Sequence, residues 1–487
     1  MRELGVGLVY WSELATLFED ADLVGVLELE PQTLWEKVGG PHGLAYRVND
    51  ELLRGVAQLP QAKLLHGIGQ PVGGTVDDPL DYVRPLRQAV DLLDPEWVSE
   101  HLSFNRVRRE GRVEEAGFLL PPRQSRAGAS VAARNIARIA QALERPFAFE
   151  TGVNYLRSRS DELDDGAFFG LVAAEAQCGI LLDLHNLWCN ERNGRQSVSD
   201  ALAQVPLNRV WEVHLAGGME FDGYWLDAHS DAVPLPVMEL AAATIPRLPN
   251  LGAIMFEVLP QHLARIGIDG VRRQLEAIHD LWSLRPQRRA VIQPASAMRD
   301  PKASAACGKD EVEEIASWEL ALLRAVRGGG NSCGAFTGLR SDPGVRVLRQ
   351  LIGDARRSSI ARALRYTTIL LLGGLGVGQT RALLDAYFNQ EPPDPFAAIE
   401  ADHFASYLRT RQEMLANIPN LEEVLAFEHA LIRATLFGTS TELTWTIDPT
   451  ALFDALDEGR PPAGLPSMHS TMRICSERAA DGGADAF

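Results

Sequence analysis

Short apolar runs alternate with longer segments of helical periodicity over about the first 280 residues of the chain. The runs are eight in number and lie at residues 4–10, 23–30, 62–69, 96–104, 145–152, 179–186, 209–217 and 252–259. Between them, segments such as 129–144, 168–177 and 238–248 repeat apolar residues at the spacing of an amphipathic helix. This alternation is typical of parallel strands joined by helices. Eight units favour a (β/α)8 barrel, or TIM barrel, over an open doubly wound sheet of about five or six strands.

The remainder of the chain has a different pattern. Residues 285–310 are rich in Pro, Ala, Ser and charge without an apolar period, which predicts a linker. Helical patterns then follow at 311–326, 345–352, 359–372, 379–390, 395–415 and 420–436, with no strand pattern between them. The sequence therefore predicts an α/β barrel domain over 1–284, a linker over 285–310, an all-α C-terminal domain over 311–460 and a disordered tail over 461–487.

Polar side chains stand near the carboxyl ends of six predicted strands. They are His66, His101, Glu150, Asp183, His214 and Glu257. Barrel active sites lie at this end of the strands, and closure of the barrel brings the six ends into one ring. Three carboxylates buried side by side cost several kcal/mol per uncompensated charge, about the penalty of an unpaired buried ion. Bound metal cations are the natural compensation.

Further candidate ligands follow strands six and seven. Asp227 and His229 lie two residues apart in the loop after the seventh strand, and Asp183 is followed by His185 and Asn186. The tally reaches about eight or nine nitrogen and oxygen ligands without a thiolate, which suits two or three ions. Imidazole and carboxylate serve iron, manganese and zinc equally well, so the ligands alone do not select the metal.

Composition restricts the compartment and the partners. The chain carries 65 acidic and 47 basic residues, a formal charge of −18, which disfavours nucleic acid and anionic membranes as partners. Its five cysteines form no CxxC pair, which suits a reducing cytoplasm and neither a disulfide framework nor a thiolate zinc site. The longest apolar stretch, 369–377, is far shorter than the ~20 residues that span a bilayer, and the N-terminus has no secretory pattern. We expect a cytoplasmic protein with no membrane segment.

The strings LGVGL, LLHGIG, VSEHLSF, FETGVNYL, LLDLHN, EVHLAGG, LDAHSDAVP and MFEV occur in this order over about residues 1–284. They resemble the multinuclear non-heme iron-dependent oxidative enzymes, the family of the methanobactin-biosynthesis oxidase. The resemblance implies a TIM barrel with two or three irons in mixed Fe(II)/Fe(III) valence. It also implies that dioxygen is used to modify a residue, typically cysteine, of a ribosomally made precursor peptide. By position, the family's metal ligands fall on His66, His101, Glu150, Asp183, Asn186, His214, Asp227, His229 and Glu257.

The chain departs from the family pattern at three places. His185 stands where the family commonly has asparagine, and is either an extra ligand or a catalytic base facing the substrate, on the premise that the strand of Asp183 continues. Gly218 replaces a histidine, and residues 32–34 replace the usual ENY. Glu28 and Glu212 are either groups that support the ligands from behind or members of an ordinary interior ion pair.

The helical region resembles, through strings such as PPDPFAAIEADHFASYL, the helical partner proteins encoded beside such oxidases. In that family the partner helps recruit the leader of the precursor peptide, so here it would be fused in cis. A P-loop-like string at 373–380 has Gln379 in place of the phosphate-binding lysine, and is interpreted as a turn between helices.

Two other functions remain as alternatives to the oxidase. One is a metal-dependent hydrolase or isomerase of the xylose-isomerase-like barrel class, in which two or three Zn²⁺ or Mn²⁺ ions activate water. The other is an inactive scaffold whose helical domain binds a partner. The full set of buried ligands disfavours the scaffold, since such groups are costly without a metal.

Overall fold

The computed structural model describes residues 1–40, 43–76, 79–286, 308–328, 336–460, 462 and 464–475. The chain divides into two compact units. The first comprises 1–35, 48–114 and 119–348, and the second comprises 36–47, 115–118 and the described part of 349–487. Most of the predicted linker, 287–307, lies outside the described residues.

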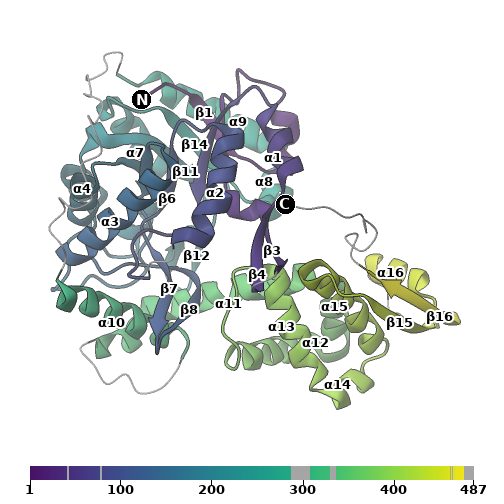
Figure 1. Ribbon diagram of the computed structural model, residues 1–487. Helices are drawn as coiled ribbons and strands as arrows, with labels where there is room; N and C mark the ends of the chain where they lie inside the picture. The colour runs from purple at the N-terminus through teal and green to yellow at the C-terminus, as the bar shows by residue number, and fades with distance from the viewer. Residues whose placement is uncertain are drawn as a thin grey trace, which may run out of the picture. The chain divides into compact units, whose positions relative to one another are not determined.

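A closed barrel of eight parallel strands forms the first unit, as the alternating pattern predicts (Figure 1). The strands are β1 (Gly5–Val9), β2 (Val26–Leu29), β5 (Ala62–Gly67), β6 (Val98–His101), β9 (Phe147–Glu150), β10 (Gly179–Asp183), β11 (Val210–Ala216) and β14 (Ala253–Glu257). Their order around the barrel follows the sequence, and β1 closes it by pairing with both β2 and β14. The prediction of a TIM barrel is confirmed.

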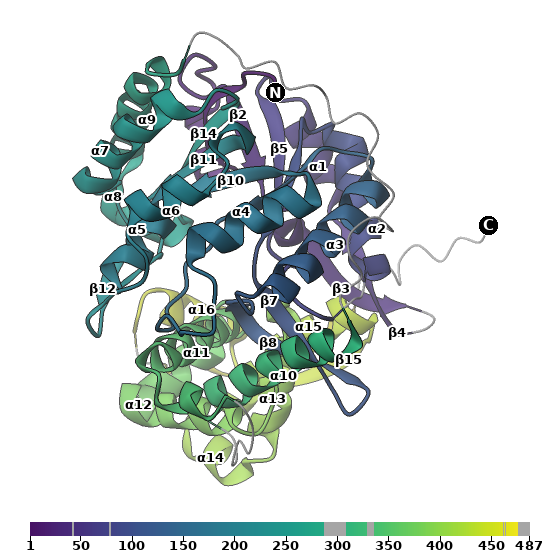
Figure 2. The same ribbon diagram turned by 90° about the vertical axis from the view of Figure 1, so that its left-hand side faces the viewer.

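Helices form the outer layer around these strands (Figure 2). They are α1 (Asp50–Ala57), α2 (Pro79–Leu93), α3 (Arg126–Leu143), α4 (Asp165–Ala176), α5 (Leu184–Arg192), α6 (Val198–Gln204), α7 (Leu235–Thr244), α8 (Leu263–Ile266) and α9 (Ile268–Ser283). In α3, Ser125 caps the first turn by accepting a hydrogen bond from Gly128 N. Helix α3 then buries Val131, Ile136 and Ile139, at helical spacing, toward the strands.

Side chains that point into the barrel recur at every second residue of a strand, so they form successive layers along the barrel axis. Val26, Leu64 and Ala148 belong to a buried apolar cluster that also contains Trp97, Ala253 and Met255. Two residues further along the same strands stand Glu28, His66 and Glu150, which face the same way. The apolar layer thus fills the barrel at the amino ends of the strands, and the polar residues collect at the carboxyl ends.

Three hairpins extend from loops at the carboxyl ends of the strands. They are β3 (Trp35–Gly40) with β4 (Gly43–Val48), β7 (Phe104–Arg109) with β8 (Arg112–Leu120), and β12 (Met219–Phe221) with β13 (Tyr224–Leu226). Most of the first hairpin and the 115–118 segment of the second belong to the second unit. The 3-10 turns are η1 (Ser12–Leu17), η2 (Pro31–Leu34), η3 (Leu207–Arg209), η4 (Ile245–Arg247), η5 (Pro260–His262) and η7 (Thr337–Ser341).

Helix α10 (Lys309–Val326), expected to begin the C-terminal domain, clusters with the barrel unit. Its Trp318 is buried and donates to Pro121 O at 3.5 Å, while Glu319 accepts a 2.7 Å hydrogen bond from Thr75 N. Contacts between distant parts of the sequence decide this assignment, and helical periodicity carries no information about them. That the C-terminal domain begins at residue 311 as an independently folding domain stays a prediction.

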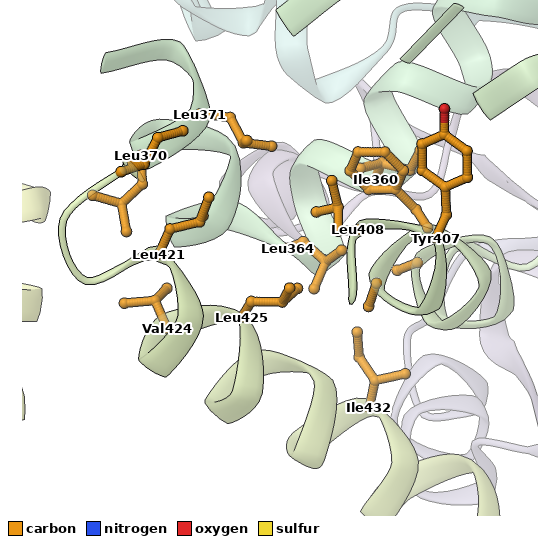
Figure 3. Packing of buried hydrophobic residues seen from close by; sticks show 14 of the residues in the cluster. Ile360, Leu364, Leu370, Leu371, Tyr407, Leu408, Leu421, Val424, Leu425 and Ile432 are labelled. Carbon is orange, nitrogen blue, oxygen red and sulfur yellow. The ribbon is translucent and has the colours of Figure 1, made fainter. Parts of the chain in front are cut away.

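The second unit is built mainly of helices. They are α11 (Pro343–Ala363), whose first residues belong to the barrel unit, and α12 (Arg365–Phe388), α13 (Ala397–Arg409), α14 (Gln412–Asn417), α15 (Leu421–Phe437) and α16 (Pro449–Asp457). Figure 3 shows side chains of α11, α12, α13 and α15 directed into one apolar core. Leu364, Leu408, Leu421 and Leu425 in this core are each at most 1% exposed. The helical character of the C-terminal region is confirmed.

Two strands correct the all-α prediction and part of the tail prediction. Strand β15 (Thr441–Ile447) pairs antiparallel with β16 (Ser467–Ile474), so a stretch assigned to a disordered tail is an ordered strand. Of the side chains in β15, only Trp445 is buried. The alternation of Leu443, Trp445 and Ile447 with threonines in β15 is a strand signal that the sequence analysis missed, and most of the other side chains in the two strands are polar and solvent-accessible. Residues 476–487 lie outside the described residues.

Among the described residues, α12 is the one helix long and apolar enough to cross a membrane. Gly376 interrupts it with a φ of 75° and a ψ of 167°, and 28% of its most apolar window is buried. This interruption falls within the P-loop-like string. It is a kink between helical segments rather than a strand-to-helix phosphate loop.

Candidate metal centre

All nine residues proposed as ligands lie at or just after the carboxyl ends of barrel strands. Six are on strands: His66 on β5, His101 on β6, Glu150 on β9, Asp183 on β10, His214 on β11 and Glu257 on β14. Asn186 lies in the first turn of α5, and Asp227 and His229 lie in the segment after β13. Register explains the convergence, because neighbouring strands place His101 beside Glu150, and Asp183 beside His214.

Glu150 connects the two histidines of strands β5 and β6. Its Oε2 atom lies 3.0 Å from Nε2 of His101 and 3.4 Å from Nε2 of His66. The two imidazole rings are 4.5 Å apart between centroids. Glu150 Oε1 accepts a 3.2 Å hydrogen bond from Nδ2 of Asn186. A cation ligated by these groups would have two imidazoles and one carboxylate facing it.

Hydrogen bonds behind the two histidines fix which ring nitrogen faces the cluster. Nδ1 of His101 donates to Gly67 O at 2.9 Å. Nδ1 of His66 lies 2.8 Å from Ser99 Oγ, which itself donates to Leu65 O at 3.4 Å and therefore accepts from the imidazole. In the neutral rings the lone pair is therefore on Nε2, the nitrogen that faces Glu150. This is the arrangement that prepares a histidine to ligate a metal.

His214 is the centre of a second group. Its Nδ1 lies 3.2 Å from Glu257 Oε2, and its Nε2 lies 3.1 Å from Glu28 Oε1. Nε2 is also 3.6 Å from Oε1 of Glu212. The other Glu212 oxygen accepts a 2.8 Å hydrogen bond from Trp97 Nε1. Glu28 and Glu212 therefore face the ring nitrogen opposite to the one that faces Glu257.

Asp183 ends its strand and begins the next helix. Its Oδ1 accepts a 2.7 Å hydrogen bond from Asn186 N, which makes Asp183 the N-cap of α5. Its backbone N–H donates to Thr151 Oγ1 at 3.0 Å. The second oxygen, Oδ2, is buried without a hydrogen-bond partner and remains available.

Asp227 and His229 join the cluster from the loop side. Nε2 of His229 lies 3.0 Å from Asp227 Oδ1 and 3.4 Å from Glu257 Oε2. The His229 backbone has a positive φ of 45°, uncommon for a residue with a side chain. Asp227, His229 and His101 are 15%, 23% and 21% exposed, whereas the strand-borne carboxylates and the other two histidines are at most 6% exposed. The centre thus reaches solvent on the side of these three residues.

Three groups of residues could each hold a metal ion, because the ligand atoms within each group lie within 4.8 Å of one another. They are His66, His101 and Glu150; Glu28, His214 and Glu257; and Glu150, Asp183 and His214. Glu150 and His214 each belong to two groups, so the three form one continuous cluster. Many of its atoms are buried without a hydrogen-bond partner, including Glu28 Oε1 and Oε2, Glu150 Oε2, Asp183 Oδ2, Asn186 Oδ1, His214 Nδ1 and Glu257 Oε2. Such a concentration of unpaired polar atoms fits a multinuclear cation site.

Burial and like charges shift the pKa values of the cluster residues. Burial raises the pKa of Asp183 well above its usual range, and the nearby Asp227, Glu150 and Glu257 carboxylates raise it further. Burial likewise raises the pKa of Glu28 to about 7 against the opposing effect of His214. Burial lowers the pKa of His101 and of His214, but nearby carboxylates outweigh this effect and leave both pKa values well above the ordinary value. The main carboxylate is Glu150 for His101 and Glu257 for His214. Protons are thus held where cations would bind.

His185 lies in a different environment from the one expected. Strand β10 ends at Asp183, and the N-cap turns the chain into α5, so His185 does not share the strand face of Asp183. It is fully buried, with Nδ1 3.0 Å from Asp227 Oδ1 and Nε2 3.1 Å from Trp225 Nε1. The strand premise behind its predicted role as a base or ligand is therefore wrong.

Glu30 is a carboxylate of the mouth that the sequence analysis missed. It follows β2, two residues after Glu28, and is partly buried. Burial raises its pKa, which is also affected by His66, Glu257, His229 and His101. The two-residue alternation along the strand would have found Glu30, and also Ser99 beside His101. Trp225 carried no such signal, because its contact with His185 depends on the fold of the β12–β13 hairpin.

Comparison with known proteins places the chain in a family. Residues 6–259 match the model of the RiPP precursor modification enzymes MbnB/TglH/ChrH, where RiPP denotes a ribosomally synthesised and post-translationally modified peptide. A UPF0276 protein of Anaeromyxobacter sp. strain Fw109-5 is 30% identical over 236 residues, which cover 47% of this chain and 80% of the relative. A UPF0276 protein of Caulobacter vibrioides is 31% identical over 191 residues, or 39% of this chain and 67% of the relative.

Among solved structures, D-psicose 3-epimerase from Clostridium cellulolyticum H10 aligns with a TM-score of 0.37 and 10% identity, covering 57% of this chain and 98% of the epimerase. A xylose isomerase domain containing protein from Salmonella typhimurium LT2 aligns with a TM-score of 0.38 and 12% identity, covering 58% and 98% respectively. The family match spans more than half of the chain, from β1 through β14. The chain belongs to the MbnB/TglH/ChrH family of RiPP precursor modification enzymes.

Proposed function

We propose that this RiPP precursor modification enzyme is a cytoplasmic multinuclear non-heme iron oxidase. It uses dioxygen to modify a residue, by this proposal cysteine, of a ribosomally synthesised precursor peptide. The observation that carries the proposal is the continuous cluster of nitrogen and oxygen ligands, with its unpaired buried atoms, at the mouth of the barrel. Family membership supplies the class of substrate.

The residues present fit two or three iron ions. Their holders would be His66, His101, Glu150, Asp183, Asn186, His214, Asp227, His229 and Glu257, with carboxylates such as Glu150 suited to bridging. Bound iron in mixed Fe(II)/Fe(III) valence would supply the redox chemistry with dioxygen that no side chain of the cluster provides. The absence of a thiolate from the cluster is consistent with this assignment but does not separate iron from manganese or zinc.

The chain's own residues prepare the centre. Gly67 O and Ser99 Oγ hold the proton of each imidazole on Nδ1, so that Nε2 of His101 and of His66 is available to a cation. Glu28 lies 3.1 Å from Nε2 of His214, while Nδ1 of the same ring faces Glu257. The apolar layer beneath, around Trp97 and Met255, excludes water from the closed end of the barrel. The peptide would approach from the more exposed side, at His101, Asp227 and His229.

The C-terminal unit would bind the leader part of the peptide in cis. Its resemblance to the helical partner proteins of such oxidases supports this assignment, and so does its own apolar core, which is separate from that of the barrel. A fused partner raises the effective concentration of the bound peptide near the barrel, to about the millimolar range for short connections.

The test is metal analysis of anaerobically purified protein, followed by turnover of a candidate precursor peptide encoded next to its gene. We expect two or three irons per chain and peptide-dependent consumption of dioxygen. A single ion per active chain would refute the proposal. Activity with zinc or manganese in the absence of dioxygen would instead favour the hydrolase or isomerase class.

A further inference from the structure

His185 connects a buried indole to the carboxylate of Asp227. Its Nε2 lies 3.1 Å from Trp225 Nε1, and its Nδ1 lies 3.0 Å from Asp227 Oδ1. The imidazole is fully buried, whereas the Asp227 carboxylate is 15% exposed. These three side chains come from two elements that the barrel brings together: α5 holds the histidine, and β13 and the residue that follows it hold the other two.

The indole determines which nitrogen of His185 carries a proton. An indole N–H donates hydrogen bonds and cannot accept them, so Nε2 of His185 must accept. In the neutral imidazole the proton is then on Nδ1, from which it is donated to Asp227 Oδ1. With both nitrogens engaged, His185 has no free lone pair for a metal ion and none for a substrate proton.

We propose that His185 is a positioning residue that fixes the orientation of the Asp227 carboxylate and is itself oriented by Trp225. The inference rests on the proposed function, in which Asp227 is a metal ligand. Asp227 is then held at two points, since its backbone N–H also donates to Tyr155 Oη at 3.1 Å. A carboxylate fixed in this way loses less freedom when it binds a cation than one on an unsupported loop does.

Gly218 leaves the space that Trp225 and His185 occupy. A Cβ atom at Gly218 would lie 2.4 Å from Trp225 Nε1 and 2.8 Å from His185 Nε2. It would also lie 2.3 Å from the backbone oxygen of Leu226, so the close approach of β13 requires glycine here. Gly218 and His185 are two of the three places at which the sequence analysis finds departures from the family pattern, and they lie close together in the structure. Cys189 Sγ, at 3.7 Å from Nε2, covers the ring from its own helix.

The test is an anaerobic titration of metal-free protein with Fe(II), which measures the number of ions bound and the affinity of each. The variants are His185→Asn, Trp225→Phe and the double variant. We expect His185→Asn to weaken the loosest ion by about 10–100-fold, the usual effect of losing a partner behind a metal ligand. Trp225→Phe should weaken the same ion by a smaller factor, because it removes the donor and keeps an aromatic ring.

The double variant tests whether Trp225 acts through His185. If it does, Trp225→Phe changes nothing further once His185 is Asn. Trp188→Phe is the matched control, since Trp188 lies against both rings, at 6.1 Å from His185 and 5.2 Å from Trp225, without a hydrogen bond to His185 among the described contacts. It should leave all affinities unchanged.

Three results would overturn the inference. One is a His185→Asn protein that loses thermal stability but keeps every iron affinity, which means that the histidine only fills space. Another is an undiminished effect of Trp225→Phe in the Asn background, which means that the indole acts independently. If wild-type protein itself binds no iron, the proposed function fails and this inference fails with it, an outcome distinct from the other two. If circular dichroism shows that His185→Asn does not fold, the Fe(II) affinities of Trp225→Phe and Trp188→Phe are compared instead. Equal affinities in these two variants would overturn the inference.

Discussion

Nε2 of His214 lies 3.1 Å from Oε1 of Glu28, and neither side chain is accessible to solvent. The carboxylate of Glu28 faces one nitrogen of the imidazole, while the other nitrogen faces Glu257 at 3.2 Å. An acidic partner of this kind raises the basicity of the histidine and fixes its tautomer. Glu28 was interpreted from sequence either as a supporting group or as part of an ordinary ion pair. Its position behind His214 favours the first interpretation.

Replacing Glu28 by Gln should therefore weaken metal binding without unfolding the barrel. We expect a loss of about 10–100-fold in the affinity of the ion nearest His214, because the amide keeps the shape but loses the negative charge. Fe(II) titration of the metal-free protein measures the effect. Glu51→Gln, on the exposed side of α1, is the control and should bind iron like wild type. An unchanged affinity in Glu28→Gln would mean that Glu28 does not act through His214.

The stability of the metal-free protein should depend on the protonation of Glu28. Its folded pKa is about 7, above the ordinary value of 4.5, so the folded state binds this proton more tightly than the unfolded state does. The corresponding stability is fully present below about pH 4.5 and is lost as the pH rises through 7. Between pH 5 and 7, the Tm of wild type should therefore decline more steeply than that of Glu28→Gln. Thermal unfolding in the presence of a chelator measures both curves, and parallel curves would contradict the prediction.

Above pH 7, the raised pKa values of His101, His214 and His229 extend the same trend. Their contribution to stability is lost as the pH rises through those values. Bound cations replace the protons, so adding iron should flatten the dependence of Tm on pH between 7 and 9. If metal-loaded and metal-free protein show the same slope, the cations do not occupy the positions of these protons.

Removal of the shared carboxylate should abolish activity. In Glu150→Ala, the contacts at 3.0 and 3.4 Å to His101 and His66 are lost together, so we expect turnover to fall by at least about 100-fold and iron content to decrease. His66→Ala and Asp183→Ala should behave alike. Circular dichroism should show an intact fold, because the barrel rests on apolar packing. Glu175→Ala, on the exposed side of α4, is the control. Substantial turnover in Glu150→Ala would exclude an essential bridging role.

A buried ion pair stabilises the second unit. Arg356 donates from Nε to Glu400 Oε1 at 2.7 Å, and the two side chains are 5% and 0% exposed. Arg356→Ala leaves the buried carboxylate unpaired and should cost about 3–5 kcal/mol of unfolding free energy. The neighbouring Arg357 pairs with half-exposed Asp354 and Asp385, so Arg357→Ala should cost at most about 1 kcal/mol. Urea unfolding followed by circular dichroism compares the two, and similar losses would contradict the assignment.

The pattern of apolar and polar residues is sufficient to predict the barrel and the placement of the polar residues at the strand ends. Both follow from period: an inward position repeats every second residue, so Glu28, His66 and Glu150 share a face with Val26, Leu64 and Ala148 whatever the rest of the chain does. This period places the six ligands that lie on strands, whereas Asn186, Asp227 and His229 join them from the first turn of α5 and from the segment after β13. Residue types at those positions also favoured a multinuclear centre before any distance was known.

Contacts between segments that are distant in sequence establish which atoms lie together. Asp183 ends strand β10 and caps α5, so His185 lies on the helix instead of continuing the strand. The β12–β13 hairpin brings Trp225 into hydrogen-bond contact with that histidine. Glu319 and Trp318 attach α10 to the barrel unit through loops more than 150 residues away in sequence. Strand β15 alternates Leu443, Trp445 and Ile447 with threonines, but this local pattern does not identify β16 as its partner. Each of these outcomes depends on contacts between distant segments, and local periodicity contains no information about which distant segment will be the partner.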